Sequence, residues 1–280
     1  MNIRQVLEKG SSILKENGIE NYYMQARILL CSVLNKPNNY LIINCYQEIE
    51  VVEEDLYFEN IKSLTEGKPL QYITKSQEFM NLKFYVDENV LIPQPDTETL
   101  VEEVLKFAHG RESLKILDLC TGSGAIAITI AKNLGNQNKV YATDISNGAL
   151  KIARKNAEYH NVKINFMQSD MFENINERFD IIVSNPPYIR NSEIKQLSKQ
   201  VQNEPHIALD GGKDGLYFYK IIINKVEHYL QKNGLIFLEI GYNQKDDIKK
   251  LILNSKKFKY NGCVKDLGGN DRVVWFNKLT

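Results

Sequence analysis

Cysteine and histidine are both scarce in this chain, which has four of each among its 280 residues. The cysteines show no C-x-x-C spacing and no histidine close by, so neither a zinc site nor a disulfide framework is predicted. We therefore expect no metal ion and four free thiols, at Cys31, Cys45, Cys120 and Cys263.

A long apolar run is also missing. A helix that crosses a membrane needs about 20 mostly apolar residues, and no segment of this chain approaches that length. Near the amino terminus, Glu8 and Lys9 stand where the core of a secretory signal would be apolar. We therefore expect a cytoplasmic protein without a membrane partner.

An excess of basic charge is the third absence, because 35 Lys and Arg residues are balanced by 35 Asp and Glu residues. Proteins that gain most of their affinity from phosphate contacts usually carry a large basic excess. Residues 1–90 even carry a net charge of −4, from 9 basic and 13 acidic side chains. The front of the chain is unsuited to nucleic acid, and no direct nucleic-acid partner is expected.

The chain does have enough apolar residues for globular cores, and its length suits one large α/β domain plus a smaller one. Apolar residues recur at helical spacing from Ile3 to Gly67, with breakers at Gly18 and Pro37, which predicts a bundle of about four helices. Two short alternating stretches, Leu82–Val86 and Val90–Ile92, predict a hairpin. The predicted domains are a helical domain at 1–67, a hairpin linker at 68–92 and an α/β domain at 93–280.

Strands and helices alternate from Leu114 onward. This alternation predicts a mostly parallel sheet covered on both faces, because right-handed crossovers place helices there. The turn-rich Gly268–Asp271 predicts an antiparallel hairpin at the sheet edge. Upstream, Asp96 is predicted to cap the helix that follows it. The seven predicted strands are 115–119, 139–143, 162–167, 179–183, 235–240, 258–264 and 272–276, and the predicted helices among them are 125–134, 147–159 and 216–230.

The segment Leu117–Ala125 places Gly122 and Gly124 where the first strand turns into its helix. Without Cβ atoms, these residues let backbone N–H groups approach a ligand at the carboxyl end of the strand. Asp144 ends the second strand, at the distance from Gly122 where an acidic side chain binds the hydroxyls of a ribose. Together these features predict a cofactor that contains adenosine.

The glycines also satisfy the dinucleotide fingerprint, so an NAD enzyme is an alternative at this point. S-adenosylmethionine is favoured because Asp118 is placed to face the cationic amino end of the methionine part, and because a second motif follows the fourth strand. Asp170, after the third strand, is predicted to accept a hydrogen bond from the adenine amino group or to cap a helix. Met171 or Phe172 would then pack on the adenine ring.

The second motif is Asn185-Pro186-Pro187-Tyr188, directly after an apolar strand. Two consecutive prolines cannot extend the sheet, and they leave carbonyls at the strand's carboxyl end, where open α/β sheets bind ligands. A simple turn after a buried strand would also begin with Asn-Pro. The position of the motif, one strand beyond the adenosine site, favours a binding role.

These residue types suit a planar nitrogen as the methyl acceptor. The lone pair of an amide or aryl amine is delocalised, so such a nitrogen is a poor nucleophile. If the Asn185 side-chain oxygen and the Pro186 carbonyl each accept one N–H, they orient the nitrogen and stabilise the positive charge that grows on it. No strong base is required, and no His–carboxylate pair is evident. The ring of Tyr188 is predicted to pack against the flat acceptor.

Several segments together resemble the protein-(glutamine-N5) methyltransferases that act on peptide chain release factors, over nearly the whole chain. Asn-Pro-Pro-Tyr alone is shared with adenine-N6 DNA methyltransferases and guanine-N2 ribosomal RNA methyltransferases, and the added segments make the resemblance specific. These segments are Gly67–Ile73, Ile92–Glu98, Asp118–Ala125, Asn185–Ile189, Glu204–Pro205, Ala208–Leu216 and Asp266–Val274.

The resemblance implies a class I S-adenosylmethionine-dependent methyltransferase with a Rossmann-like fold. Its implied substrate is the side-chain amide of the glutamine in the Gly-Gly-Gln motif of class I release factors, which supports translation termination. Residues 1–67 are expected to recognise the release factor. Asn185, Pro186 and Tyr188 would be catalytic and, with Pro187, would bind the glutamine. The expected cofactor residues are Asp118, Thr121, Gly122, Ser123, Gly124, Ala125, Asp144, Asp170, Met171 and Asn185.

Two positions depart from the family pattern, which often has Arg where this chain has Gln94 and an aromatic residue where it has Met171. The first change affects contacts to the partner, and the second affects packing on the adenine. The alternative function is an adenine-N6 or guanine-N2 nucleic-acid methyltransferase, which would need a basic groove. A binding module without activity is disfavoured by the intact Gly122, Asp144 and Asn185.

Overall fold

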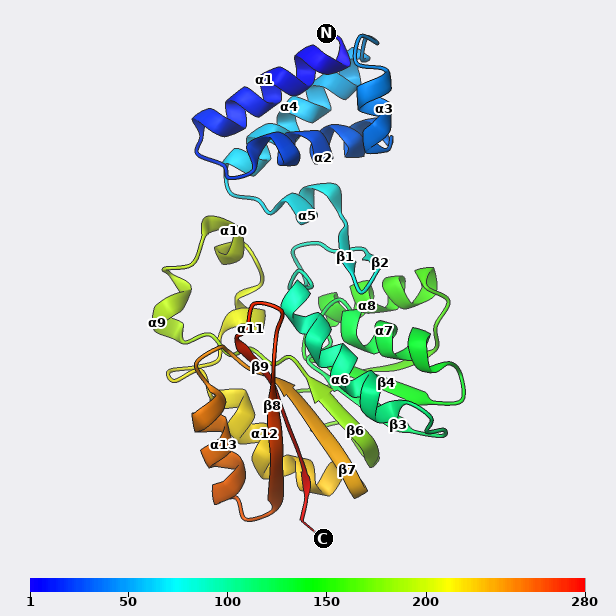
Figure 1. The fold of residues 1–280 in the computed structure, drawn as a ribbon, viewed down its shortest axis with the longest axis vertical. Coiled ribbons are helices and arrows are strands. Elements are labelled where there is room, and N and C mark those ends of the chain that lie inside the picture. The colour runs from blue at the N-terminus through cyan, green and yellow to red at the C-terminus, as the bar shows by residue number, and fades with distance from the viewer. Residues whose placement is uncertain (280) are drawn as a thin grey trace. The chain divides into compact units, whose positions relative to one another are not determined.

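Residues 1–279 are described by the computed structural model and form two compact units (Figure 1). Residues 1–75 and 198–203 make the helical unit, and residues 76–197 with 204 onward make the α/β unit. The helical unit extends past residue 67 because α5 (Leu70–Thr74) and α10 (Lys199–Gln202) belong to it. Within residues 1–279, no helix is both long and apolar enough to cross a membrane.

Four helices form the body of the helical unit, in agreement with the predicted bundle. The first begins with a capping box, in which Asn2 Oδ1 accepts from the Gln5 N–H at 2.9 Å and Gln5 Oε1 accepts from the Asn2 N–H at 3.0 Å. Gly10 is required at the closest helix contact, because a Cβ there would lie 2.1 Å from Tyr57 Oη. The helices are α1 (Ile3–Glu16), α2 (Tyr22–Leu34), α3 (Asn38–Ile43) and α4 (Val51–Thr65).

The α/β unit contains a seven-stranded sheet in the order β5-β4-β3-β6-β7-β9-β8. The first five strands in this order are parallel to one another, whereas β9 is antiparallel to both β7 and β8. This confirms the predicted parallel sheet with an antiparallel edge hairpin. The strands are β3 (Lys115–Leu119), β4 (Lys139–Asp144), β5 (Ile164–Gln168), β6 (Phe179–Ser184), β7 (Leu230–Glu239), β8 (Phe258–Lys265) and β9 (Asp271–Lys278).

Alternate side chains of the central strands enter two different cores, because successive strand residues point to opposite faces. Ile116 and Ile181 pack with α6 and α7 on one face, while Leu117 and Ile182 pack with α12 and α13 on the other. Figure 1 shows these helices beside the sheet. The helices of this unit are α6 (Glu98–Ala108), α7 (Ala125–Leu134), α8 (Asn147–Tyr159), α9 (Asn191–Ile194), α11 (His206–Leu209), α12 (Tyr217–Lys225) and α13 (Lys245–Asn254).

Some local predictions are wrong. The first hairpin pairs β1 (Gln77–Phe79) with β2 (Leu82–Phe84), so the apolar stretch Val90–Ile92 is not a strand. Asp96 does not cap α6, because it lies in a 3-10 turn, η1 (Pro95–Thr97), and its carboxylate binds Arg272. The predicted helix to residue 230 is also too long, since η2 (Val226–Tyr229) follows α12 and β7 begins at residue 230.

A buried ion pair fixes β9 to the turn that precedes it. Arg272 Nε donates to Asp266 Oδ2 at 3.0 Å, and the Asp266 side chain is only 1% exposed. Removing one partner leaves an uncompensated buried charge, so Arg272→Met should lower the free energy of unfolding by about 3–5 kcal/mol in urea titrations. Lys250→Met is the control, because it removes only an exposed pair with Asp247 and should have little effect.

The same ion pair makes the free energy of unfolding depend on pH. Burial raises the pKa of Asp266, but hydrogen bonds from Asn270 and Arg272 outweigh burial and hold this pKa below its usual value. The resulting stability is present above the pKa of the unfolded carboxyl and is lost as the pH falls through the folded value. The free energy of unfolding of Arg272→Met should therefore fall less steeply towards acidic pH than that of the parent protein. An equally steep fall would contradict this assignment.

Candidate active site

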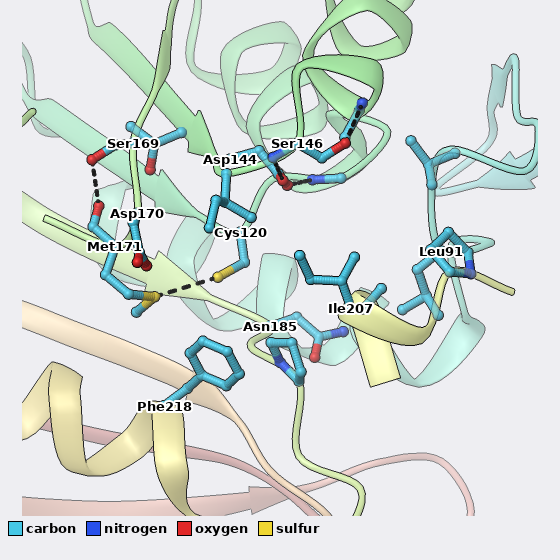
Figure 2. A pocket seen from close by; sticks show the side chains of 18 of the residues that line it. Leu91, Cys120, Asp144, Ser146, Ser169, Asp170, Met171, Asn185, Ile207 and Phe218 are labelled. Atoms are coloured by element: carbon cyan, nitrogen blue, oxygen red, sulfur yellow. Dashed lines mark hydrogen bonds between the residues drawn. The ribbon is translucent and has the colours of Figure 1, made fainter. Parts of the chain in front are cut away.

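A pocket opens at the carboxyl ends of the parallel strands of the α/β unit (Figure 2). Loops after β3, β4, β5 and β6 supply one part of its wall, and residues 89–91, 205–208 and 217–218 supply the rest. Figure 2 shows Asp144 and Asn185 on opposite sides of the pocket. The pocket thus joins the two predicted motifs in one site.

The glycines of the turn after β3 have different structural roles. Gly122 has φ of +54°, and no atom lies within 4 Å of the Cβ it lacks, so its open side faces the pocket that it lines. Gly124 has φ of +83°, and a Cβ there would lie 2.9 Å from Ile128 Cδ1 and 3.2 Å from Ala153 Cβ. Gly122 therefore gives a ligand access, whereas Gly124 allows close packing of α7 against α8.

Asp144 is held at the end of β4 by two backbone donors. The Gly122 N–H donates to its Oδ2 at 2.8 Å and the Ser146 N–H donates to its Oδ1 at 2.9 Å. Burial raises the pKa of this carboxyl, and the backbone hydrogen bonds oppose that rise. These contacts fix both oxygens at the pocket wall and leave their remaining lone pairs for hydroxyl donors such as those of a ribose.

Several predicted cofactor residues lie behind the pocket wall. Asp118 is fully buried, its Oδ2 accepts from Thr121 Oγ1 at 2.6 Å, and its Oδ1 has no partner among residues 1–279. Burial raises the pKa of Asp118 to about 7. Ser123 and Ala125 are buried as well. Asp118, Thr121, Ser123 and Ala125 do not line the pocket. They therefore support the glycine turn from behind and affect the pocket only through it.

The loop after β5 contributes Asp170 and Met171 to the pocket. Asp170 is exposed, while Met171 is buried with φ of +48° and its Sδ lies 3.8 Å from Cys120 Sγ (Figure 2). Phe172 turns away and stacks on Tyr229 at a centroid distance of 4.6 Å. Of the two residues predicted to pack on adenine, only Met171 therefore reaches the pocket.

The acceptor motif follows β6 directly. Asn185 Nδ2 donates to Thr97 Oγ1 at 3.1 Å, which leaves the amide oxygen for a donor in the pocket. Asn185 and Pro187 line the pocket, whereas Pro186 and Tyr188 do not. The Tyr188 ring packs in the apolar cluster under α12, and its hydroxyl lies 3.4 Å from Glu239 Oε1. Burial raises the pKa of Tyr188 well above its usual value, so this hydroxyl stays protonated.

Two residues whose structural roles sequence reasoning did not predict hold the loops around the site. Glu204 Oε2 accepts from the Ile92 N–H at 2.9 Å and so brings residues 204–208 against residues 89–92. Gln244 Nε2 donates to the carbonyls of Tyr188 and Gly215, at 3.0 and 3.1 Å. Both act across long sequence separations, so no local pattern predicts them.

Gln94 stands where the family often has Arg. It is exposed, and it donates to the Ile92 carbonyl at 3.0 Å.

Apolar walls complete the pocket. Phe218 lies near Asn185 and Met171, and Ile207 faces them from α11 (Figure 2). Neither was predicted, since single apolar residues in connecting segments carry no distinctive signal. Residues 1–279 contain no cluster of three or more His, Cys, Asp or Glu side chains that could hold a metal ion.

The parallel sheet with its antiparallel edge, the open glycine turn and the Asp144 carboxylate at the end of β4 define a class I S-adenosylmethionine-dependent methyltransferase. The Methyltransferase small domain model matches residues 95–213, and the PrmC N-terminal domain model matches residues 5–74. The chain belongs to the release factor glutamine methyltransferase family. Proteins of that name from Clostridium botulinum and Clostridium acetobutylicum are 40% and 41% identical to it over 280 residues, which cover 98% of each chain.

Solved structures support the fold. A methyltransferase from Pyrococcus furiosus superposes with a TM-score of 0.56 at 20% identity, over 79% of this chain and 99% of that one. A ribosomal RNA methyltransferase from Thermus thermophilus, in complex with AdoMet and guanosine, gives 0.52 at 19% identity, over 73% of this chain and 50% of that one. At these identities the likeness concerns the fold alone.

Proposed function

We propose that this enzyme transfers a methyl group from S-adenosylmethionine to the side-chain amide nitrogen, N5, of the glutamine in the Gly-Gly-Gln motif of class I release factors. One observation carries the choice of acceptor: the Asn185 amide nitrogen is engaged by Thr97, so its oxygen is directed to an N–H donor in the pocket. Membership of the release factor glutamine methyltransferase family supports the substrate. The enzyme would act in the cytoplasm, beside the translation machinery.

The chemistry follows from the acceptor groups. When bound, S-adenosylmethionine supplies an electrophilic methyl group on a sulfonium. Asn185 Oδ1 and the Pro186 carbonyl each accept one N–H of the glutamine amide, so the nitrogen faces the methyl group. The N–C bond would form as the bond between the methyl carbon and sulfur breaks, with neutral S-adenosylhomocysteine as the leaving group. The two fixed oxygens would stabilise the positive charge that grows on the nitrogen. Loss of one proton from the nitrogen to water would then give a neutral N-methyl amide.

The cofactor contacts are also a proposal. Gly122, Asp144, Asp170, Met171 and Asn185 line the pocket and would touch S-adenosylmethionine directly. Asp144 would bind the ribose hydroxyls and Met171 would pack on the adenine, with its soft thioether replacing an aromatic ring. The remaining predicted cofactor residues would shape the turn from behind: Asp118, Thr121, Ser123, Gly124 and Ala125.

Mass spectrometry of a labelled reaction tests the proposed function. Purified enzyme is incubated with methyl-labelled S-adenosylmethionine and an unmodified release factor, with DNA and ribosomal RNA in parallel reactions. The label should reach the Gly-Gly-Gln glutamine and leave other glutamines unmodified. Preferential labelling of a nucleic-acid base would overturn the substrate assignment in favour of an adenine-N6 or guanine-N2 methyltransferase.

We also propose that the helical unit recognises the body of the release factor. An apolar surface on α3, α4 and the loop between them is exposed, and acidic side chains at 48, 50, 55 and 59 lie along the same segment. Such a surface suits a partner with apolar and basic side chains. The apolar surface consists of Ile42, Ile43, Tyr46, Val51, Val52 and Leu56.

A charge placed in this surface should weaken release-factor binding. The double variant Ile43→Glu with Val52→Glu is expected to raise KM for the release factor about 10-fold, because loss of one of the few dominant contacts of an interface costs more than about 1 kcal/mol. The affinity for S-adenosylmethionine should not change. Leu253→Glu, on exposed α13, is the control. A KM within twofold of the parent enzyme would contradict the recognition role.

A further inference from the structure

The orientation of the Asn185 side chain decides what its amide can do. One end of an amide accepts hydrogen bonds and the other end donates them, and the two ends have nearly the same shape. Only the oxygen end can accept an N–H from a glutamine amide. A rotation by half a turn would present a donor to the substrate and repel it. The enzyme therefore needs a device that fixes this orientation.

Thr97 is the residue that touches the other end of the amide. Its Oγ1 accepts from Asn185 Nδ2 at 3.1 Å, and its side chain is 5% exposed, so water does not compete for the contact. A hydroxyl that accepts one hydrogen bond still has one hydrogen to donate. The carboxylate of Glu239, at the end of β7, faces Thr97 on its other side, and the Thr97 hydroxyl helps to hold the pKa of this carboxyl down.

Glu239 is an ionisable group buried in the interior. It is 2% exposed, its Oε2 has no hydrogen-bond partner among residues 1–279, and Tyr188 Oη lies 3.4 Å from its Oε1. An ionised carboxylate only accepts hydrogen bonds. An ionised Glu239 can only receive the hydrogen of the Thr97 hydroxyl, which leaves the Thr97 oxygen to accept from Asn185, as the 3.1 Å contact shows. This polarity leaves the Asn185 oxygen facing the pocket.

We infer that Thr97 and Glu239 are positioning residues that fix the orientation of the Asn185 amide for methyl transfer. The inference rests on the proposed role of Asn185. Neither residue lines the pocket, so both act through Asn185 and not on the substrate. Thr97 comes from the turn before α6 and Glu239 from the strand next to β6, so residues from three separate elements meet behind the pocket wall.

Protonation of Glu239 should reverse the direction of hydrogen bonding from Glu239 through Thr97 to Asn185. A neutral carboxyl can donate to Thr97, whose hydroxyl then donates to Asn185 and selects the wrong orientation. Burial raises the pKa of Glu239 to about 7, and Thr97, Arg272 and Tyr188 oppose that rise. Other groups facing this region are Asp96 from η1, Arg272 from β9, Tyr188 after β6 and Tyr219 from α12. The value of kcat should therefore fall as the pH drops through this range.

Steady-state kinetics with release factor as the substrate test the inference. Thr97→Val keeps the shape but removes the hydroxyl, and it should lower kcat about 10- to 100-fold through misplacement of the amide. The affinity for S-adenosylmethionine should stay within twofold, and Thr97→Ser should restore most of kcat. The matched control is Thr129→Val, because Thr129 is a buried threonine of α7 whose hydroxyl has no partner among the described residues.

The pH profile separates positioning from a structural role. Glu239→Gln cannot ionise, so its kcat should lose the decline at lower pH that the parent enzyme shows. This comparison also decides the matter if Thr97→Val folds poorly. A kcat of Thr97→Val close to that of Thr129→Val, or an unchanged pH profile in Glu239→Gln, would overturn the positioning role. Full turnover by Asn185→Ala would instead overturn the proposed function on which the inference rests.

Discussion

Asn185→Ala is expected to lower kcat by at least about 100-fold, as removal of one fixed group that stabilises transition-state charge does in other enzymes. The variant loses the oxygen that would accept one N–H of the substrate amide, and it also loses the contact with Thr97. S-adenosylmethionine binding should remain measurable, because Asp144 and the glycine turn lie on the other side of the pocket (Figure 2). Single-turnover kinetics measure the rate of methyl transfer, and calorimetric titration measures the affinity for S-adenosylmethionine.

The control for this variant is Asn254→Ala. Asn254 is exposed at the end of α13, so its truncation should leave both kcat and cofactor affinity unchanged. If Asn185→Ala turned over at the parent rate, the amide would not be gripped by this side chain. A loss of cofactor binding equal to the loss of turnover would instead make Asn185 a cofactor residue alone.

Asp144→Asn should weaken S-adenosylmethionine binding by about 10- to 100-fold. Hydrogen bonds to a charged group contribute about 1.5–3 kcal/mol each, and the substitution removes the charge that the ribose hydroxyls would contact. The new amide would also place a donor against the N–H of Gly122 or Ser146. Isothermal titration calorimetry measures the change directly.

Asp180→Asn provides a matched control for this change. Asp180 also accepts from a backbone N–H, that of Lys115 at 2.8 Å, but it lies at the start of β6 and away from the pocket. Its substitution should change stability and not cofactor affinity. A dissociation constant for Asp144→Asn within twofold of the parent value would remove the ribose assignment.

The sequence predicted those parts of the site that depend on local pattern. Gly122, Asp144 and Asn185 were identified because each lies at or just after the end of a strand, and the carboxyl ends of parallel strands meet at one edge of a sheet. The helices α7 and α8 begin and end where the periodicity placed them, since glycine or serine precedes each and sharp turns follow.

Contacts between distant segments were beyond sequence reasoning. Thr97 and Glu239 lie 88 and 54 positions from Asn185, and nothing in either neighbourhood signals their convergence. Asp118 was predicted to face the cofactor because it precedes the turn, but it is fully buried on the same face of β3 as Ile116 and does not line the pocket. The misplaced cap at Asp96 has a similar cause, because an ion pair with Arg272 competes for its carboxylate.

The position of β9 has a consequence for how the chain folds. This strand follows β8 in the sequence but lies between β7 and β8 in the sheet. β8 can pair with β9 as a local hairpin, but it joins the rest of the sheet only when β9 pairs with β7, where Leu235 pairs with Asn277. Pairing between such distant residues carries a high entropic cost and forms slowly. The edge of the sheet should thus assemble late and as one step, after the parallel strands already define the pocket.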